Sequence, residues 1–403
     1  MKLQRALRIG TAASFMGFAS VTAFPGFTSV GETQTLPTPS SNVSVFATGF
    51  NNPRGLTFGP DGNLYVAEGG LGGTASTVGQ CTQVPAPVGP YTGSTTGGRI
   101  SKVSSAGVRS TVTDALPSDQ TAPTQGSLVS GVASIAFVGN TMYALEAGAG
   151  CGHGVLNTAT GVYRIDTLYG TAAMIANLGS FEQANPTKTI EPDDFEPDGT
   201  WYSMIAVNGT LYAVEPNHGE IDQVNPATGS ITRLADISAT QGHIVPTSVA
   251  YNAGNFFVGN LGVFPINPGS EKILQITPTG TVTVAATGLT TVLGVAFDRF
   301  GQMYALETAT KAGLPGPTNV GTGLIVKVSS SGSPQTIASG FTFPTGMTFG
   351  PDGNIYVSQT GFGLPAGAGQ VLKVTVPQGV PLSASVAGST GHGAGNRYAA
   401  IAN

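Results

Sequence analysis

A short pattern of apolar and polar positions recurs six times along the chain. A small residue leads into an apolar triplet, a Gly-rich tight turn follows, and a second apolar run ends in a polar side chain. The copies span residues 55–68, 134–146, 204–215, 248–260, 294–307 and 346–359. Because Asp-Gly at positions 61–62 and 352–353 is typical of hairpin turns, each copy predicts two antiparallel strands joined by a tight turn.

Further strand-like runs with period-two alternation follow each copy. The third runs lie at residues 99–103, 162–165, 221–224, 273–276, 325–328 and 371–374. A fourth run follows most of them, for example at residues 281–284 and 335–337. Such alternation is typical of half-buried antiparallel strands. Four-stranded antiparallel blades repeated in this way predict an all-β, six-bladed β-propeller. A β-sandwich would explain the strands but not the repetition.

The N-terminal strand is expected to close the ring. The sixth unit ends after three strands, near Val376, and a spare strand at about residues 43–48 resembles the fourth strands of other units. We therefore expect this strand to complete the last blade, which removes the open sheet edges that promote aggregation. The propeller is expected to span residues 41–378.

The chain ends predict export. Residues 1–23 have the form of a signal peptide, with Lys2, Arg5 and Arg8 before a short apolar stretch and a small-residue cleavage site. The stretch is too short and too broken for a retained membrane anchor. Residues 24–40 are interpreted as a linker and 379–403 as a flexible Gly/Ala/Ser-rich tail. We expect a secreted or periplasmic monomer with no membrane span after signal removal.

Composition narrows the class of partner. Charged residues make up 9% of the chain, and 59 Gly and 27 Pro indicate a globular protein rich in turns. A net charge of −5 without a basic stripe excludes nucleic acid as the expected partner. In an oxidising compartment Cys81 and Cys151 are expected to form a disulfide. A metal-binding pair and two free thiols are the alternatives.

The long connections predict where function lies. In each unit the first turn is short, whereas the extra length follows the second strand. These longer connections are residues 69–98, 147–160, 260–270, 308–322 and 359–369, and the segment 179–202 is expected to open on the same face. Long loops on one face of a rigid scaffold are the usual location of binding sites.

The polar residues that end the repeated pattern are expected to form a ring at the channel mouth on this loop-rich face. They are Glu68, Glu146, Glu215, Asn260, Glu307 and Gln359. Oxygen ligands suit Ca²⁺, for which the expected set is Glu68, Glu146, Glu215 and Glu307. The same groups suit ligand contact or acid–base chemistry. A structural alternative is that they accept backbone N–H bonds from the next blade.

Other polar residues extend this candidate site. Arg54 has no counterpart in the other repeats and suits an anionic group of a ligand, or an ion pair with Glu68. The acidic segment 191–199, beside Trp201, is either a Ca²⁺-binding loop or a solvated turn. His153, His218 and His243 fall on loops of the same face, and the sequence does not predict whether they converge. Nucleophile-elbow, phosphate-loop, zinc-protease and dinucleotide motifs are absent from the sequence.

The segment from Asn51 to Gly73 resembles the opening of the ScyD/ScyE family of exported proteins. Residues 245–250 and 344–353 match motifs shared with NHL-like and gluconolactonase-like propellers, and the resemblance covers most of residues 43–376. It implies an exported six-bladed propeller and carries no activity with it.

Three functions follow as hypotheses. The first is an exported propeller that binds a small molecule, glycan or protein partner on its loop-rich face. The alternative is a Ca²⁺-dependent or carboxylate-dependent hydrolase or oxidase at the mouth of the central channel. The second alternative is an envelope or matrix protein with an interaction role. Whether the protein is an enzyme stays open at this stage.

Overall fold

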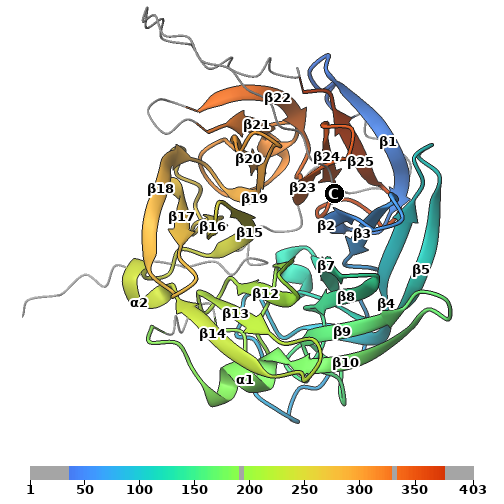
Figure 1. The fold of residues 1–403 in the computed structure, drawn as a ribbon. Helices are drawn as coiled ribbons and strands as arrows, with labels where there is room; N and C mark the ends of the chain where they lie inside the picture. The colour runs from blue at the N-terminus through green and yellow to red at the C-terminus, as the bar shows by residue number, and fades with distance from the viewer. Residues whose placement is uncertain (1–35, 190–194, 329–333, 377–403) are drawn as a thin grey trace, which may run out of the picture.

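Six antiparallel sheets surround a central channel in the computed structural model, which describes residues 36–189, 195–328 and 334–376 (Figure 1). The predicted six-bladed β-propeller is confirmed. The first three blades contain β2 (Pro53–Phe58), β3 (Leu64–Glu68), β4 (Thr92–Val103), β5 (Arg109–Gln120) and β6 (Val129–Ser130); β7 (Val132–Val138), β8 (Thr141–Glu146), β9 (Gly161–Asp166) and β10 (Thr171–Asn177); and β11 (Ser203–Val207), β12 (Thr210–Glu215), β13 (Glu220–Val224) and β14 (Ile231–Asp236).

The other three blades follow the same order. They contain β15 (Pro246–Asn252), β16 (Asn255–Asn260), β17 (Glu271–Ile276) and β18 (Val282–Leu289); β19 (Val292–Phe297), β20 (Met303–Glu307), β21 (Gly323–Lys327) and β22 (Gln335–Phe341); and β23 (Gly346–Phe349), β24 (Ile355–Gln359), β25 (Gly369–Val374) and β1 (Val43–Phe50). Blade 1 differs from the prediction, because the short strand β6 extends its sheet to five strands.

The ring closes through β1, as the sequence predicts. It pairs antiparallel with β25, from Val43 opposite Val374 to Phe50 opposite Gly369. Two irregularities in the register bend this outer strand around the blade. The strand at the start of the chain therefore completes the sheet formed at its end.

The hydrophobic core is divided among the six junctions between neighbouring blades. Between blades 1 and 2, for example, Tyr65, Ile100 and Leu116 pack against Ile135 and Met142. Alternation along each strand places apolar side chains on both faces of a blade, so that each blade packs against two neighbours. The ring is held by these six layers of contacts.

The disulfide prediction is confirmed. Cys81 and Cys151 are bonded, with a Cα–Cα distance of 6.2 Å. The bond joins the long β3–β4 connection of blade 1 to the β8–β9 connection of blade 2.

Helices are few among the described residues. Helix α1 (Leu178–Ala184) lies in the long connection between blades 2 and 3, and α2 (Ser238–Gln241) follows blade 3. A search of the described residues finds no helix with the length and apolar character needed to cross a membrane.

Candidate functional site

The six ring residues predicted at the channel mouth are buried. Exposed fractions are 0% for Glu68, Glu146 and Glu215, and at most 6% for Asn260, Glu307 and Gln359. Most of them bond to the segment that leads into the first strand of their own blade. Glu68 accepts from Asn51 N at 2.6 Å, and Glu215 accepts from Thr200 N at 2.9 Å. The sequence had suggested contacts with the next blade. These ring residues instead fasten their blade to its own incoming segment, whereas Glu146 accepts from Gly148 N just after its strand.

Burial shifts the acidity of two ring carboxyls. Burial raises the pKa of Glu146 to about 8, opposed by hydrogen bonding from the Gly148 backbone. Burial also raises the pKa of Glu307 to about 7, opposed by the Thr290 backbone. Near neutral pH the neutral form of Glu146 is thus favoured, whereas Glu307 is close to half-ionised.

Arg54 is 5% exposed and binds backbone carbonyls. Its Nη2 donates to Val129 O at 2.6 Å, and its Nη1 donates to Gly361 O. Glu68 is paired with Arg99 instead, at 2.5 Å. Burial lowers the pKa of the Arg54 guanidinium. Arg54 therefore joins blade 1 to a loop of blade 6 beneath the loop-rich face.

An apolar cluster closes the loop-rich end of the channel. Tyr202 reaches from blade 3 to blade 6 and donates its hydroxyl proton to Thr345 O at 2.5 Å. Loop residues from several blades pack around it, namely Leu128, Val245, Leu261, Phe264, Ile266, Leu293 and Ala309, with Phe362 against them. A pocket of about 20 Å³ remains beside Arg54. That volume holds about one water molecule.

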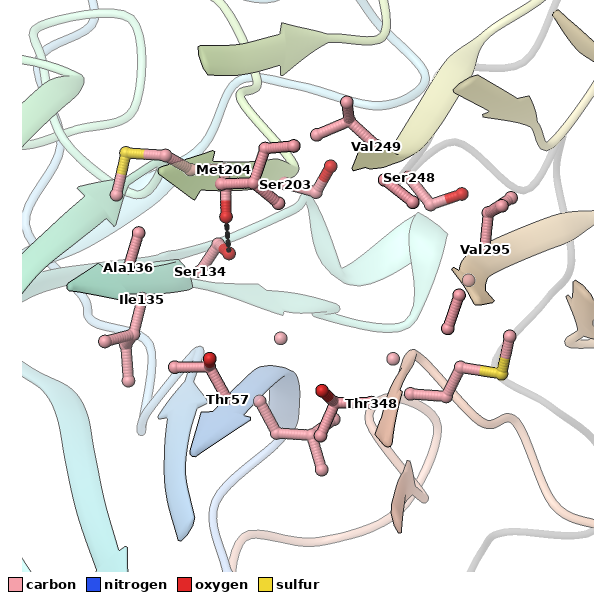
Figure 2. A pocket seen from close by; sticks show the side chains of 18 of the residues that line it. Thr57, Ser134, Ile135, Ala136, Ser203, Met204, Ser248, Val249, Val295 and Thr348 are labelled. Atoms are coloured by element: carbon pink, nitrogen blue, oxygen red, sulfur yellow. Dashed lines mark hydrogen bonds between the residues drawn. The ribbon is translucent and has the colours of Figure 1, made fainter. Parts of the chain in front are cut away.

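The large cavity lies in the channel itself and holds about 500 Å³. It is lined by the innermost strands of all six blades (Figure 2). Near the loop-rich face these strands are buried, as at Thr345 and Leu293, which are 2% exposed. Near the short turns they become half-buried, as at Phe58 and Phe349. The cavity therefore opens on the short-turn face, opposite to the face on which the sequence places the candidate site.

Hydroxyl groups supply the polar side chains of this cavity. Ser134 donates to Met204 O at 3.3 Å and Ser203 donates to Thr247 O at 2.7 Å, so both join neighbouring blades. The Ser248 hydroxyl is buried and has no hydrogen-bond partner among the described residues. Thr57 and Thr348 are half-buried at the channel wall (Figure 2). None of the described residues that line the cavity carries a charge.

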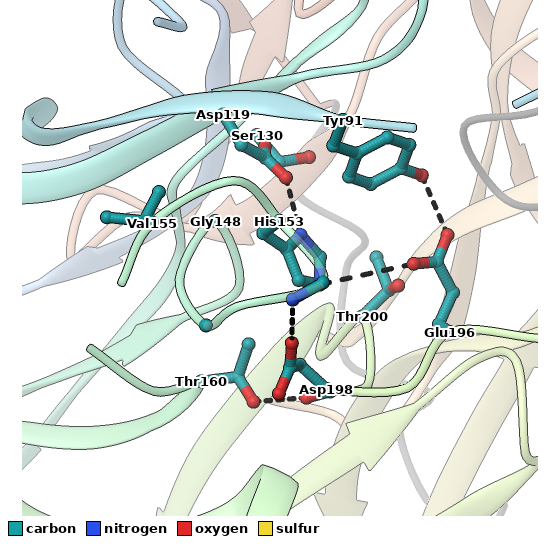
Figure 3. Close-up of polar contacts among 12 residues, drawn as sticks. Tyr91, Asp119, Ser130, Gly148, His153, Val155, Thr160, Glu196, Asp198 and Thr200 are labelled. Carbon is teal, nitrogen blue, oxygen red and sulfur yellow. Dashed lines mark hydrogen bonds and ion pairs between the residues drawn. The ribbon is translucent and has the colours of Figure 1, made fainter. Parts of the chain in front are cut away.

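His153 belongs to a separate buried cluster (Figure 3). Its Nδ1 lies 2.5 Å from Asp119 Oδ2, and its Nε2 lies 4.0 Å from Glu196 Oε2. Burial by itself lowers the pKa of His153. The charge and hydrogen bond of Asp119 and the charge of Glu196 raise it, and the resulting pKa is about 9. The imidazolium thus links blade 1 to the β8–β9 connection and to the connection before blade 3.

His218 lies in another cluster, where its imidazole contacts the carboxylate of Glu182. Its backbone N–H donates to Glu215 Oε2 at 2.5 Å. Burial lowers the pKa of His218 to about 4, which favours the neutral imidazole. The structure therefore brings Glu215 and His218 together and places His153 elsewhere. Glu182, on α1, was not foreseen, because no sequence periodicity connects α1 to blade 3. Of the predicted acidic segment, residues 191–194 lie outside the described residues.

Comparisons with known proteins give similarity in fold. No protein-family model and no curated protein matches the chain. A structural-genomics protein of unknown function from Bacteroides thetaiotaomicron is 13% identical, with a TM-score of 0.51 over 83% of this chain and 76% of that one. A putative oxidoreductase (glucose dehydrogenase) from Thermus thermophilus is 16% identical (TM-score 0.47; 82% and 98% covered). A gluconolactonase from Xanthomonas campestris is 9% identical (TM-score 0.47; 83% and 89% covered).

The likeness to the Bacteroides thetaiotaomicron protein, at 13% identity, indicates a shared fold and does not imply a shared chemistry. The resemblance to the ScyD/ScyE family stays a prediction, since no protein-family model matches the chain.

Proposed function

We propose that this protein binds a small uncharged molecule, rich in hydroxyl, ether or carbonyl groups, in its central channel. The observation that carries the proposal is a cavity of about 500 Å³ whose side chains are hydroxyl-bearing or apolar and uncharged. This volume lies within the usual range for small-molecule sites. A charged ligand would lose its hydration there without gaining an ionic partner.

The hydroxyls at the wall are suited to hydrogen bonding with a ligand. Thr57 and Thr348 are half-buried at the cavity wall. Thr57 and Thr348 lie on neighbouring blades 1 and 6, so they face one ligand from adjacent positions (Figure 2).

Binding is favoured over acid–base catalysis at this site. General acid–base chemistry needs a titratable side chain within hydrogen-bond reach of the reacting group. The described cavity lining contains no carboxylate, imidazole or amine, and the hydroxyl of its Tyr202 is buried and donates to Thr345 O. The disulfide suits an oxidising compartment, so we place this binding activity outside the cytoplasm.

Calorimetry with matched neutral and anionic compounds tests the proposal. Monosaccharides, polyols and aldonolactones are titrated into the oxidised mature chain, alongside the corresponding aldonates. We expect a neutral compound to bind, and the double variant Thr57→Val/Thr348→Val to weaken its binding about tenfold by removing two hydrogen bonds. Thr283→Val, on the outer strand β18, is the matched control. Binding of the aldonates alone, or equal affinity in both variants, would contradict the proposal.

A further inference from the structure

Blade 3 departs from a pattern seen in blades 1 and 6. The polar residue at the end of the second strand meets a complementary side chain on the third strand. Glu68 pairs with Arg99 in blade 1, and Gln359 Nε2 donates to Gln370 Oε1 at 2.8 Å in blade 6. In blade 3, Glu215 stands directly opposite Glu220. Like charges in directly opposed positions destabilise a sheet.

More carboxylates surround this pair than one arginine balances. Glu182, Glu220 and Asp222 are at most 3% exposed, as buried as Glu215. Arg233 contacts Glu220 and lies 4.0 Å from Asp222. The Oε2 of Glu182 and the Oε1 of Glu220 are buried and accept no hydrogen bond from the described residues. Buried carboxylates without donors are costly unless a cation compensates them.

Two of these carboxylates and a neighbouring histidine converge in a geometry suited to a metal ion. One oxygen each of Glu182 and Glu215 and one imidazole nitrogen of His218 all lie within 4.8 Å of one another. Glu182 comes from α1, Glu215 from the end of β12, and His218 from the turn before β13. Glu215 accepts backbone N–H bonds through both oxygens, which holds its carboxylate in place.

We propose that Glu182, Glu215 and His218 bind a divalent transition-metal ion of the Zn²⁺ or Mn²⁺ class. The imidazole ligand distinguishes this site from a Ca²⁺ site, since Ca²⁺ prefers oxygen ligands only. The site is distinct from both the channel cavity and the four-Glu set predicted from sequence, of which it shares Glu215. Because Glu182 belongs to the connection between blades 2 and 3, the ion would fasten that connection onto blade 3.

The site is tested by metal analysis and thermal melting of the full mature chain, which is produced without a histidine tag. The chain is stripped with a chelator and reconstituted with Zn²⁺, Mn²⁺ or Ca²⁺. We expect one bound Zn²⁺ or Mn²⁺ and a rise in Tm on the order of 5 °C over the stripped chain. Glu182→Gln and His218→Gln should each weaken binding at least tenfold. Glu146→Gln, at the ring position of blade 2, should bind metal as the unmodified chain does.

A spectroscopic measurement covers the case in which these variants fail to fold. In the Mn²⁺-loaded unmodified chain, electron-spin-echo spectra should show coupling to one imidazole nitrogen. Lack of that coupling overturns the site, as does the absence of bound Zn²⁺ and Mn²⁺ after reconstitution. Stabilisation by Ca²⁺ alone, or equal loss of metal in Glu146→Gln, also overturns it, the latter in favour of the ring predicted from sequence.

Discussion

The same residue type serves different purposes at equivalent positions of the repeat. Glu68 is paired with Arg99, Glu146 is favoured in its neutral form, and Glu215 lies among other carboxylates. Their surroundings distinguish them: Arg99 lies opposite Glu68, Gly161 opposite Glu146 and Glu220 opposite Glu215. For Glu146, burial is the main cause of the raised pKa.

Glu307 provides a test of this at the residue scale. Burial raises its pKa to about 7, so the folded state favours the neutral form. The stability linked to this proton is fully present below the ordinary pKa of 4.5 and is lost as the pH rises through 7. We therefore compare how much the free energy of unfolding in urea falls from pH 5 to pH 8. This fall should be smaller for Glu307→Gln than for the unmodified chain, by on the order of 2–3 kcal/mol. Parallel profiles would show that Glu307 is ionised in the fold.

The sequence predicts where the ring residues lie along the strands better than it predicts which side chains they contact. Periodicity located all six ring residues at strand ends, and the structure places them there. Their burial depended on loops such as the one carrying Leu261 and Phe264, which have no periodicity. Glu182 joins Glu215 only through the path of the connection before blade 3, and that path is not encoded by any local pattern.

At the scale of elements, the tight turns illustrate what a local sequence can specify. Asp352 accepts hydrogen bonds from Asn354 N at 3.1 Å and Tyr356 Oη at 3.1 Å, and pairs with Lys373 at 2.7 Å. Asp61 makes the same contacts in blade 1 with Asn63, Tyr65 and Lys102. These turns were predictable because all but one partner lie within four residues. Strand β6, which pairs with β5 by two residues, offered no such signal.

The closing strand β1 carries a prediction about packing. Phe50 is fully buried at the end of β1, within the cluster that joins blades 6 and 1. Its truncation leaves a cavity where the ring closes, so Phe50→Ala should lower the free energy of unfolding by about 3–5 kcal/mol. Phe300→Ala is the control, because Phe300 is 52% exposed in a short turn. Comparable losses in both variants, measured by urea unfolding, would argue against β1 as a packed part of the ring.

At the scale of the molecule, the disulfide joins two blades that share a hydrophobic layer. Cys81 and Cys151 are separated by 70 residues, and a bridge over that distance contributes about 4 kcal/mol in the chain-entropy description. Cys81→Ser/Cys151→Ser should therefore melt at a lower temperature than the oxidised chain. A reductant should lower the Tm of the unmodified chain and leave the variant unchanged. Equal Tm values for the oxidised chain and the variant would mean that the contacts between blades suffice.

Tyr202 and the apolar cluster around it close the channel at its loop-rich end. This closure constrains how fast a channel ligand can bind and dissociate. A molecule that enters from the short-turn face must leave through the same opening. A bulkier side chain at the rim would raise one barrier that is shared by arrival and departure. Both rate constants should then fall by the same factor, while Kd stays constant. Residence time in this propeller is thus adjustable at the rim without any change in affinity.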